Sequence, residues 1–143
     1  ARGAHIYAVV DAVEGDRGNR DEGRFEKRLS RLSALASNLK GDDTVVFSGA
    51  SGLADLASRE KAVLEQEFEG AAIRGFGGVT GHGMEAQFPL GLALAALSLD
   101  GRSLVPAFDA ANEKPMAKPA GHAVVTTVGY TRGEGVAVLS KNA

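Results

Sequence analysis

A glycine-rich loop followed by an apolar run constrains the fold of this chain more than any other stretch. It spans residues 74 to 99, RGFGGVTGHGMEAQFPLGLALAALSL, and its first ten residues include Gly75, Gly77, Gly78, Gly81 and Gly83. Glycine permits positive φ and close backbone approach at a cost in folding entropy, so this density indicates a loop whose geometry demands it. We call residues 75–83 the glycine loop.

The apolar run after the loop predicts a helix that is buried on most sides. Residues 88 to 99 carry apolar side chains around the whole helical circumference. Pro89 suits the first turn of a helix, so we expect the regular helix to start near Phe88, with residues 82–87 as an irregular lead-in. His82 then lies just ahead of the helix amino end, where the dipole disfavours imidazolium and N–H groups can face an anion or a carbonyl oxygen.

Composition indicates one globular domain, residues 1–143, with 44% hydrophobic and 24% charged residues. No apolar run reaches the roughly 18 residues of a membrane-spanning helix, and no signal peptide is visible. A net charge of -2 gives no electrostatic reason to expect nucleic acid as a partner. The chain has no cysteine, so it supplies neither a thiolate nucleophile nor a thiolate metal ligand. It begins without methionine, which predicts a fragment, a processed product or the second part of a longer protein.

Hydrophobic periodicity predicts the order βαβαβα followed by two or three strands, an α/β layered domain with a parallel or mixed sheet. Apolar residues recur at steps of four, three and three from Phe25 to Leu35, within a helix expected to begin near Arg20. The expected strands are residues 4–13, 44–47, 71–73, 123–128 and 136–140, and a second helix follows the turn at residues 48–52. Ligands collect at the carboxyl ends of strands in such sheets, so residues 48–52, the glycine loop and residues 128–135 are expected to converge.

His82 is the strongest candidate for a functional residue, and its alternative role is a histidine that is hydrogen-bonded for structure. His5 and His122 lie in or beside strands and are expected to be structural. The three histidines lack the close spacing of a zinc site, so no metal and no cofactor are expected.

Two motifs suggest other chemistry. Residues 48–52, SGASG, stand where a nucleophile elbow would, but Leu53 occupies the last glycine position of the pattern centred on Ser51. Ser48 and Ser51 are therefore expected to be turn or helix-cap residues. Residues 81–86 match G-x-G-x-x-A after a strand, which leaves open a dinucleotide- or phosphate-binding module.

Several segments of the chain resemble a known protein family. TGHGMEAQFPLGLALAALSLDGRSLVP resembles the carboxyl-terminal half of β-ketoacyl-acyl carrier protein synthases, the condensing enzymes of the thiolase superfamily. The strand that opens that half is similar to ARGAHIYAVVDAVEGD. Its first histidine motif and the following helix are similar to DTVVFSGASGLADLASREKAVLEQEF, and its terminal hairpin is similar to TTVGYTRGEGVAVL. The resemblance implies one half of a thiolase-like fold, with a strand at Leu104 and Val105 leading to a proline.

The resemblance assigns a role to several site residues. His82 falls on the second of the family's two catalytic histidines, and Thr80 and Gly81 match the residues before it. The place of the first histidine is taken by Ser48 or Phe47, so that catalytic group is absent.

The family's lysine–glutamate pair is absent as well. The lysine corresponds to Gly77 and the glutamate to Gly91, while Tyr130 falls where the family has a gating phenylalanine beside the acyl pocket. Residues that act as a unit do not substitute for one another, so a condensing site without these groups is expected to be crippled.

The function implied is chain elongation of fatty acids or polyketides, by decarboxylative condensation on carrier-bound acyl chains in the cytoplasm. The expected partners are an acyl carrier protein with its acyl or malonyl group, an amino-terminal half that supplies the cysteine, and a second ketosynthase in a homo- or heterodimer. The departures favour a degenerate partner subunit, similar to the polyketide chain-length factors. The alternative is an active, divergent synthase that uses His82.

Overall fold

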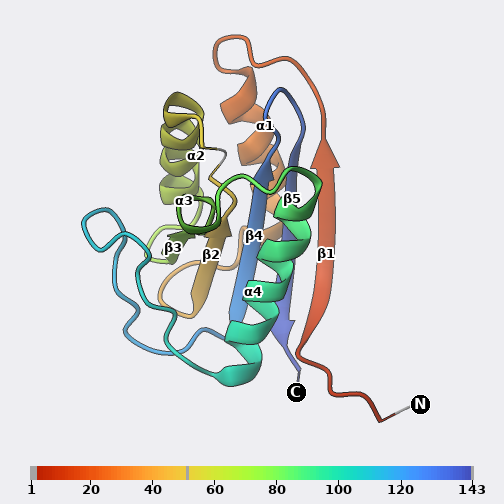
Figure 1. Cartoon of the computed structure of the whole chain (residues 1–143), viewed down its shortest axis with the longest axis vertical. Helices are drawn as coiled ribbons and strands as arrows, with labels where there is room; N and C mark the ends of the chain where they lie inside the picture. Colours follow the sequence, from red (N-terminus) through yellow and green to blue (C-terminus); the bar gives the residue numbers. More distant parts are fainter. Residues whose placement is uncertain (1–2, 51, 143) are drawn as a thin grey trace.

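The computed structural model describes residues 3–50 and 52–142 as a mixed five-stranded sheet with helices on both faces (Figure 1). The strands are β1 (Ala8–Asp16), β2 (Thr44–Ser48), β3 (Ala72–Gly75), β4 (His122–Val128) and β5 (Glu134–Lys141). The helices are α1 (Arg24–Ser33), α2 (Ala54–Glu67), α3 (Gly77–Thr80) and α4 (Gln87–Gly101), with 3-10 turns η1 (Ala34–Ala36) and η2 (Met84–Ala86). No helix among these residues is long and apolar enough to cross a membrane.

The sheet order β1-β5-β4-β2-β3 places the parallel strands together. β2 pairs in parallel with both β3 and β4, whereas β5 runs antiparallel to β4 and β1. This mixed sheet confirms the predicted fold class. Because β2, β3 and β4 run the same way, their carboxyl ends lie at one edge of the sheet, the upper edge in Figure 1.

The largest differences from the predicted boundaries are in β1 and α1. β1 begins at Ala8 and continues to Asp16, beyond the expected end, because Asp16 still pairs with Glu134 of β5. α1 begins at Arg24 instead of near Arg20, because Gly23 has φ 72° and so cannot belong to a right-handed helix.

Each face of the sheet has its own core. Figure 1 shows α1 and α2 on one face and α4 on the other. The apolar stripe of α1 packs, as predicted, with α2 against one face of the strands; this core includes Phe25, Leu29, Leu32, Leu64, Val46 and Val124. The core under α4 includes Ala95, Leu99, Phe47, Phe76, Val125 and Leu139.

α4 is not buried on most sides, so that prediction is wrong. The buried residues of α4 form a single stripe at every fourth position: Gln87, Gly91, Ala95 and Leu99. Leu97 on another face is 57% exposed. Val10 and Val13 of β1 are also about half exposed. They lie on the side of the sheet that α4 covers, since they pair with Leu139 and Ala137, which belong to the core under α4. We call Leu97, Val10 and Val13 the α4 face.

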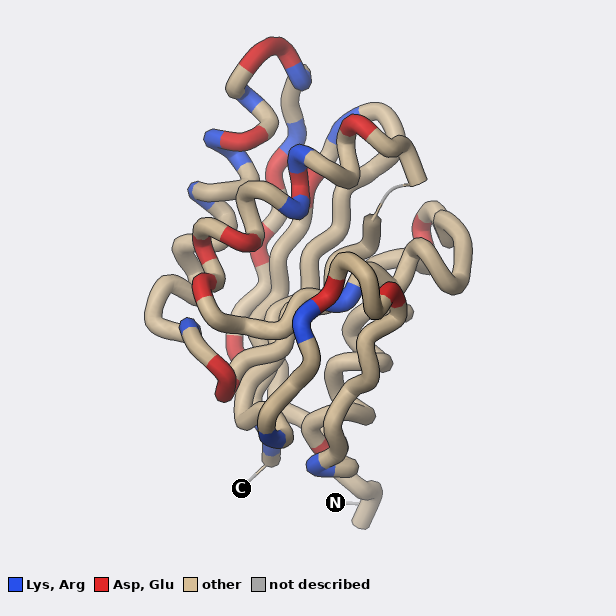
Figure 2. The backbone as a smooth tube through the Cα atoms, turned by 90° about the vertical axis from the view of Figure 1, so that its left-hand side faces the viewer, with Lys and Arg blue, Asp and Glu red and all other residues tan. Residues whose placement is uncertain are grey.

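Charge is distributed unevenly between the two faces. Figure 2 shows Lys, Arg, Asp and Glu gathered along α1, α2 and the loops beside them. α4 carries a single charged residue, Asp100, near its carboxyl end. α4 itself is therefore apolar over most of its length, with one charge near its carboxyl end.

Residues 103–121 contain no strand, so the strand expected at Leu104 and Val105 is absent. The buried Arg74 of β3 holds this segment: its Nε and Nη2 donate to Val105 O at 3.1 and 2.9 Å, and its Nη1 donates to Lys114 O at 2.9 Å. Glu113 also accepts a bond from Gly75 N at 2.7 Å. The carbonyl of Val105 thus binds a side chain instead of a neighbouring strand.

Candidate active site

Backbone hydrogen bonds hold the loops after β2 and β3 against the ends of the neighbouring strands. Phe76 N donates to Ser48 O and Gly49 N donates to Thr126 O, both at 3.1 Å. Gln87, which is 1% exposed, adds a side-chain link: its Nε2 donates to Gly49 O at 2.5 Å and its Oε1 accepts from Gly83 N at 2.6 Å. The sequence analysis missed Gln87, although a lone amide before a wholly apolar run is a visible signal.

Gly77 lets two of these loops touch. A Cβ on Gly77 would lie 2.0 Å from Gly49 O and 2.4 Å from Ala50 O. Residues 77–80 form the single helical turn α3, where the sequence predicted an irregular loop. The turn ends at Gly81, whose φ of 75° explains the glycine there.

His82 is half-buried beside Tyr130. The two ring centroids lie 6.0 Å apart with the planes tilted by 46°. His82 Nδ1 is buried and has no hydrogen-bond partner in the described part of the chain. Thr80 does not reach it, because its Oγ1 lies 3.1 Å from Phe76 O and 3.0 Å from Gly81 O and uses its proton there. Nδ1 is therefore a buried polar atom that lacks the hydrogen bond such atoms normally have.

Ser48 is not brought to His82. Its side chain is buried, and its Oγ accepts a bond from Ala50 N at 3.2 Å. Ser48 and Thr126 lie opposite each other in the sheet and both bond to Glu60 of α2, with Thr126 Oγ1 donating to Glu60 Oε1 at 2.7 Å. Ser48 therefore belongs to a buried polar cluster beneath α2. Ser51 lies outside the described residues.

Glu60 is fully buried, and burial raises the pKa of its carboxyl, opposed by the hydrogen bonds from Thr126 and Ser48. Its Oε2 has no partner within residues 3–50 and 52–142. A neutral, protonated carboxyl is the form that such a site favours.

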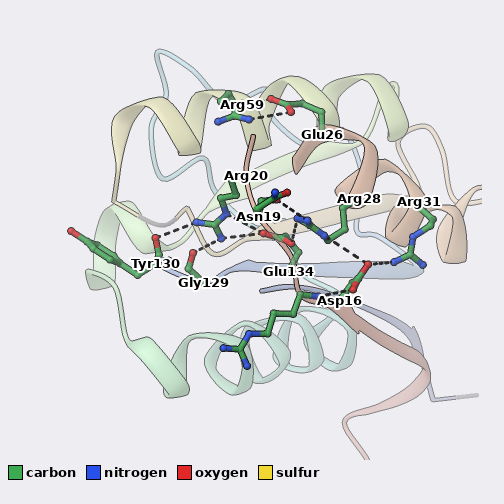
Figure 3. Close-up of polar contacts among 11 residues, drawn as sticks. Asp16, Asn19, Arg20, Glu26, Arg28, Arg31, Arg59, Gly129, Tyr130 and Glu134 are labelled. Atoms are coloured by element: carbon green, nitrogen blue, oxygen red, sulfur yellow. Dashed lines mark hydrogen bonds and ion pairs between the residues drawn. The ribbon is translucent and has the colours of Figure 1, made fainter. Parts of the chain in front are cut away.

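Tyr130 lies in the turn between β4 and β5, residues 129–133, which we call the hairpin turn. Figure 3 shows Arg20 reaching this turn from the loop before α1. Its Nη2 donates to Gly129 O at 2.6 Å, its Nη1 donates to Tyr130 O at 3.1 Å, and it forms an ion pair with Glu134 at 3.0 Å. No sequence pattern indicates that Arg20 and Glu134 meet, because they stand 114 positions apart.

The surface around His82 is apolar and locally strained. Val79, Met84 and Tyr130 are 67%, 68% and 58% exposed. Met84 has φ 49° and Ala50 has φ 41°, positive values that non-glycine residues rarely adopt and that concentrate at functional sites. The end of the sheet near His82 therefore offers apolar side chains around one unpaired imidazole nitrogen.

The geometry does not suit a dinucleotide site. Gly83 N, which would face a phosphate in the G-x-G-x-x-A motif, already donates to Gln87 Oε1. β3, the strand before the motif, is also an edge strand of the sheet.

The two glycines that the resemblance aligns with the family's lysine and glutamate have no room for a side chain. Gly77 packs against the backbone of residues 49 and 50, and a Cβ on Gly91 would lie 2.6 Å from Val125 Cγ1. Loop packing and core packing therefore fill the space beyond both Cα atoms.

Comparison with known proteins gives matches in structure alone. No protein-family model matches the chain, and no curated protein matches it by sequence. The oxazolomycin ketosynthase domain OzmH KS8 of Streptomyces albus JA3453 matches with a TM-score of 0.73 and 19% identity, over 95% of this chain and 45% of that one. Ketosynthase twelve of the bacillaene polyketide synthase from Bacillus amyloliquefaciens matches with a TM-score of 0.75 and 16% identity, over 97% and 31%.

A third similar structure is the type II polyketide synthase assembly AntDE:AntF, an acyl carrier protein in complex with its ketosynthase bound to the hexaketide. Its TM-score is 0.76 at 17% identity, over 99% of this chain and 40% of that one. This chain spans less than half the length of each of these three structures. The chain therefore has the fold of one part of a ketosynthase domain.

Proposed function

We propose that this chain is the carboxyl-terminal half of a cytoplasmic ketosynthase-like protein that shapes the acyl pocket of a fatty-acid or polyketide elongation complex. In this proposal it does not perform the condensation. The observation that carries it is the packing at Gly77, the position that the resemblance gives to the family's lysine: a Cβ there would lie 2.0 Å from Gly49 O. Ser48, in the place of the first catalytic histidine, bonds within the Glu60 cluster and so offers no donor to a thioester.

The α4 face supports a role beside other polypeptides. Leu97, Val10 and Val13 expose apolar side chains, and exposed apolar surfaces mark protein–protein contacts. We propose that the complementary half, which contains the other wall of the pocket, binds to this face. The two halves together would form a homo- or heterodimer with a ketosynthase. The AntDE:AntF complex, which contains an acyl carrier protein, supports a carrier-bound acyl chain as the ligand.

One observation favours the alternative of an active, divergent synthase. The unpaired Nδ1 of His82, when it carries the ring proton, can donate a hydrogen bond to a thioester or enolate oxygen. Oriented donors at a developing negative charge lower the barrier by about 3 kcal/mol each. The two functions make different demands on His82: catalysis requires its imidazole, whereas a pocket wall requires only its volume.

The deciding experiment measures condensation of malonyl-carrier protein by the full-length protein alone and together with an active ketosynthase. We expect no product from the protein alone, and a changed product length when Tyr130→Ala is introduced into the mixed assembly. Tyr7→Ala, the chain's other tyrosine, is the matched control and should leave the product length unchanged. Condensation by the protein alone that is lost in His82→Ala would establish the active synthase instead.

A further inference from the structure

The hairpin turn depends on a contact from outside its own hairpin for its position. Gly129 N donates to Gly133 O at 2.8 Å, which closes the turn locally. A Cβ on Gly129 would lie 2.7 Å from Arg132 O, so the turn is tight as well. These bonds set the shape of the turn, but they do not connect it to the glycine loop that carries His82.

Arg20 supplies the external contact. Its guanidinium binds the carbonyls of Gly129 and Tyr130, the first two residues of the turn, and the carboxylate of Glu134 just after it (Figure 3). The guanidinium also lies over the Phe25 ring, 5.7 Å from its centroid, and Phe25 is fully buried in the core. Arg20 therefore connects the turn to the core beneath α1.

Glu134 holds Arg20 in this orientation. Its carboxylate is 0% exposed and also accepts a bond from Arg28 Nη1 at 2.9 Å, while Arg28 Nη2 donates to Asn19 O at 2.8 Å. Both arginines thus bind one buried carboxylate, but in these contacts only Arg20 also reaches the hairpin turn. A planar guanidinium can bind a carboxylate and two carbonyls at once, whereas a lysine ammonium cannot reproduce that geometry.

We propose that Arg20 is a positioning residue for the candidate site: by binding Gly129 O, Tyr130 O and Glu134 together, it holds the Tyr130 ring beside His82. The inference rests on the proposed function only in treating the surroundings of His82 as the site. In the proposed acyl pocket, Arg20 then fixes the place of one wall without touching the ligand.

The test compares two conservative variants, Arg20→Lys and Arg28→Lys, by NMR of the His82 ring in the protein without ligand. Both variants keep a positive charge beside Glu134, so they are matched in charge. The Tyr130 ring shifts the His82 ring protons, and Tyr130→Leu defines the chemical shift in the absence of that ring. We expect Arg20→Lys to move the His82 resonance most of the way to the Tyr130→Leu value, and Arg28→Lys to leave it at the wild-type value.

A wild-type His82 resonance in Arg20→Lys, or an equal displacement in Arg28→Lys, would overturn the inference. If Arg20→Lys does not fold, Arg20→Gln, which leaves the Arg28–Glu134 ion pair in place, is read in the same way. The measurement needs no acyl ligand and no partner. A failure of Tyr130→Ala to change product length would therefore reject the proposed function while leaving the positioning result intact.

Discussion

Replacing Gly77 by alanine tests whether the glycine loop and the loop after β2 touch. The new Cβ would lie 2.0 Å from Gly49 O, whereas real Cβ atoms keep at least 3.0 Å, so one loop must move by about 1 Å. Overpacking of this kind costs about 1–3 kcal/mol. The movement also strains the bond from Gln87 Nε2 to Gly49 O, which is worth about 1 kcal/mol. We therefore expect Gly77→Ala to lower the free energy of unfolding by about 2–4 kcal/mol.

Gly78 provides the matched control, because it is the next residue in the same helical turn. A Cβ there meets nothing within 4 Å. Gly78→Ala should be neutral or stabilising by up to about 1 kcal/mol, through the lower conformational entropy of the unfolded chain. Urea denaturation followed by far-UV circular dichroism measures both variants. Equal stability of Gly77→Ala and Gly78→Ala would refute the close approach of the two loops.

The remaining predictions concern the buried Glu60, the buried Arg74 and the α4 face. Because burial raises the pKa of Glu60, its contribution to stability is fully present below the unfolded pKa and is lost as pH rises through the folded pKa. Glu60→Gln should therefore gain stability over wild type as urea titrations move from acid to neutral pH; a constant difference would contradict this. Arg74→Met should cost about 3 kcal/mol, because it leaves the carbonyls of Val105 and Lys114 unpaired, and protease should then cut residues 105–114 faster. Leu97→Glu should change the chain's stability by less than about 0.5 kcal/mol yet prevent binding of the complementary half in co-purification; retained binding would move the interface elsewhere.

Local patterns were sufficient for most elements of the fold. The stripe of Phe25, Leu29 and Leu32 predicts the buried face of α1, because helix periodicity alone sets which side chains share a face. The exposure of α4 could not be predicted in this way. Periodicity reports how apolar a helix is, while its burial depends on which other surfaces pack against it. Leu97 is apolar, yet it is exposed because no other surface in the described part of this chain packs against it.

In the candidate site, too, local features could be predicted from the sequence, whereas contacts between distant residues could not. His82 was found because its glycine neighbours are visible as a run, and the convergence of loops follows from parallel strands sharing an edge. The contacts that position these groups join distant residues: Gln87 binds a carbonyl 38 positions away, and Arg20 binds a carboxylate 114 positions away. Neither pair forms a local motif, so a single sequence gives no signal that the partners meet.

The proposed function assumes that Gly77 and Gly91 stand where the family has its charged pair. Removing both charges together avoids leaving one unpaired charge buried, which is the more costly outcome. The space beyond the Cα of Gly77 is filled by the carbonyls of residues 49 and 50, and Gln87 of α4 donates a hydrogen bond to one of them. The loop that carries Ser48 is thereby fixed against the glycine loop, and a lysine at position 77 would have to displace that backbone before reaching any substrate. The arrangement suits a site that contributes a fixed wall, because its parts support one another through packing and do not leave space for the missing groups.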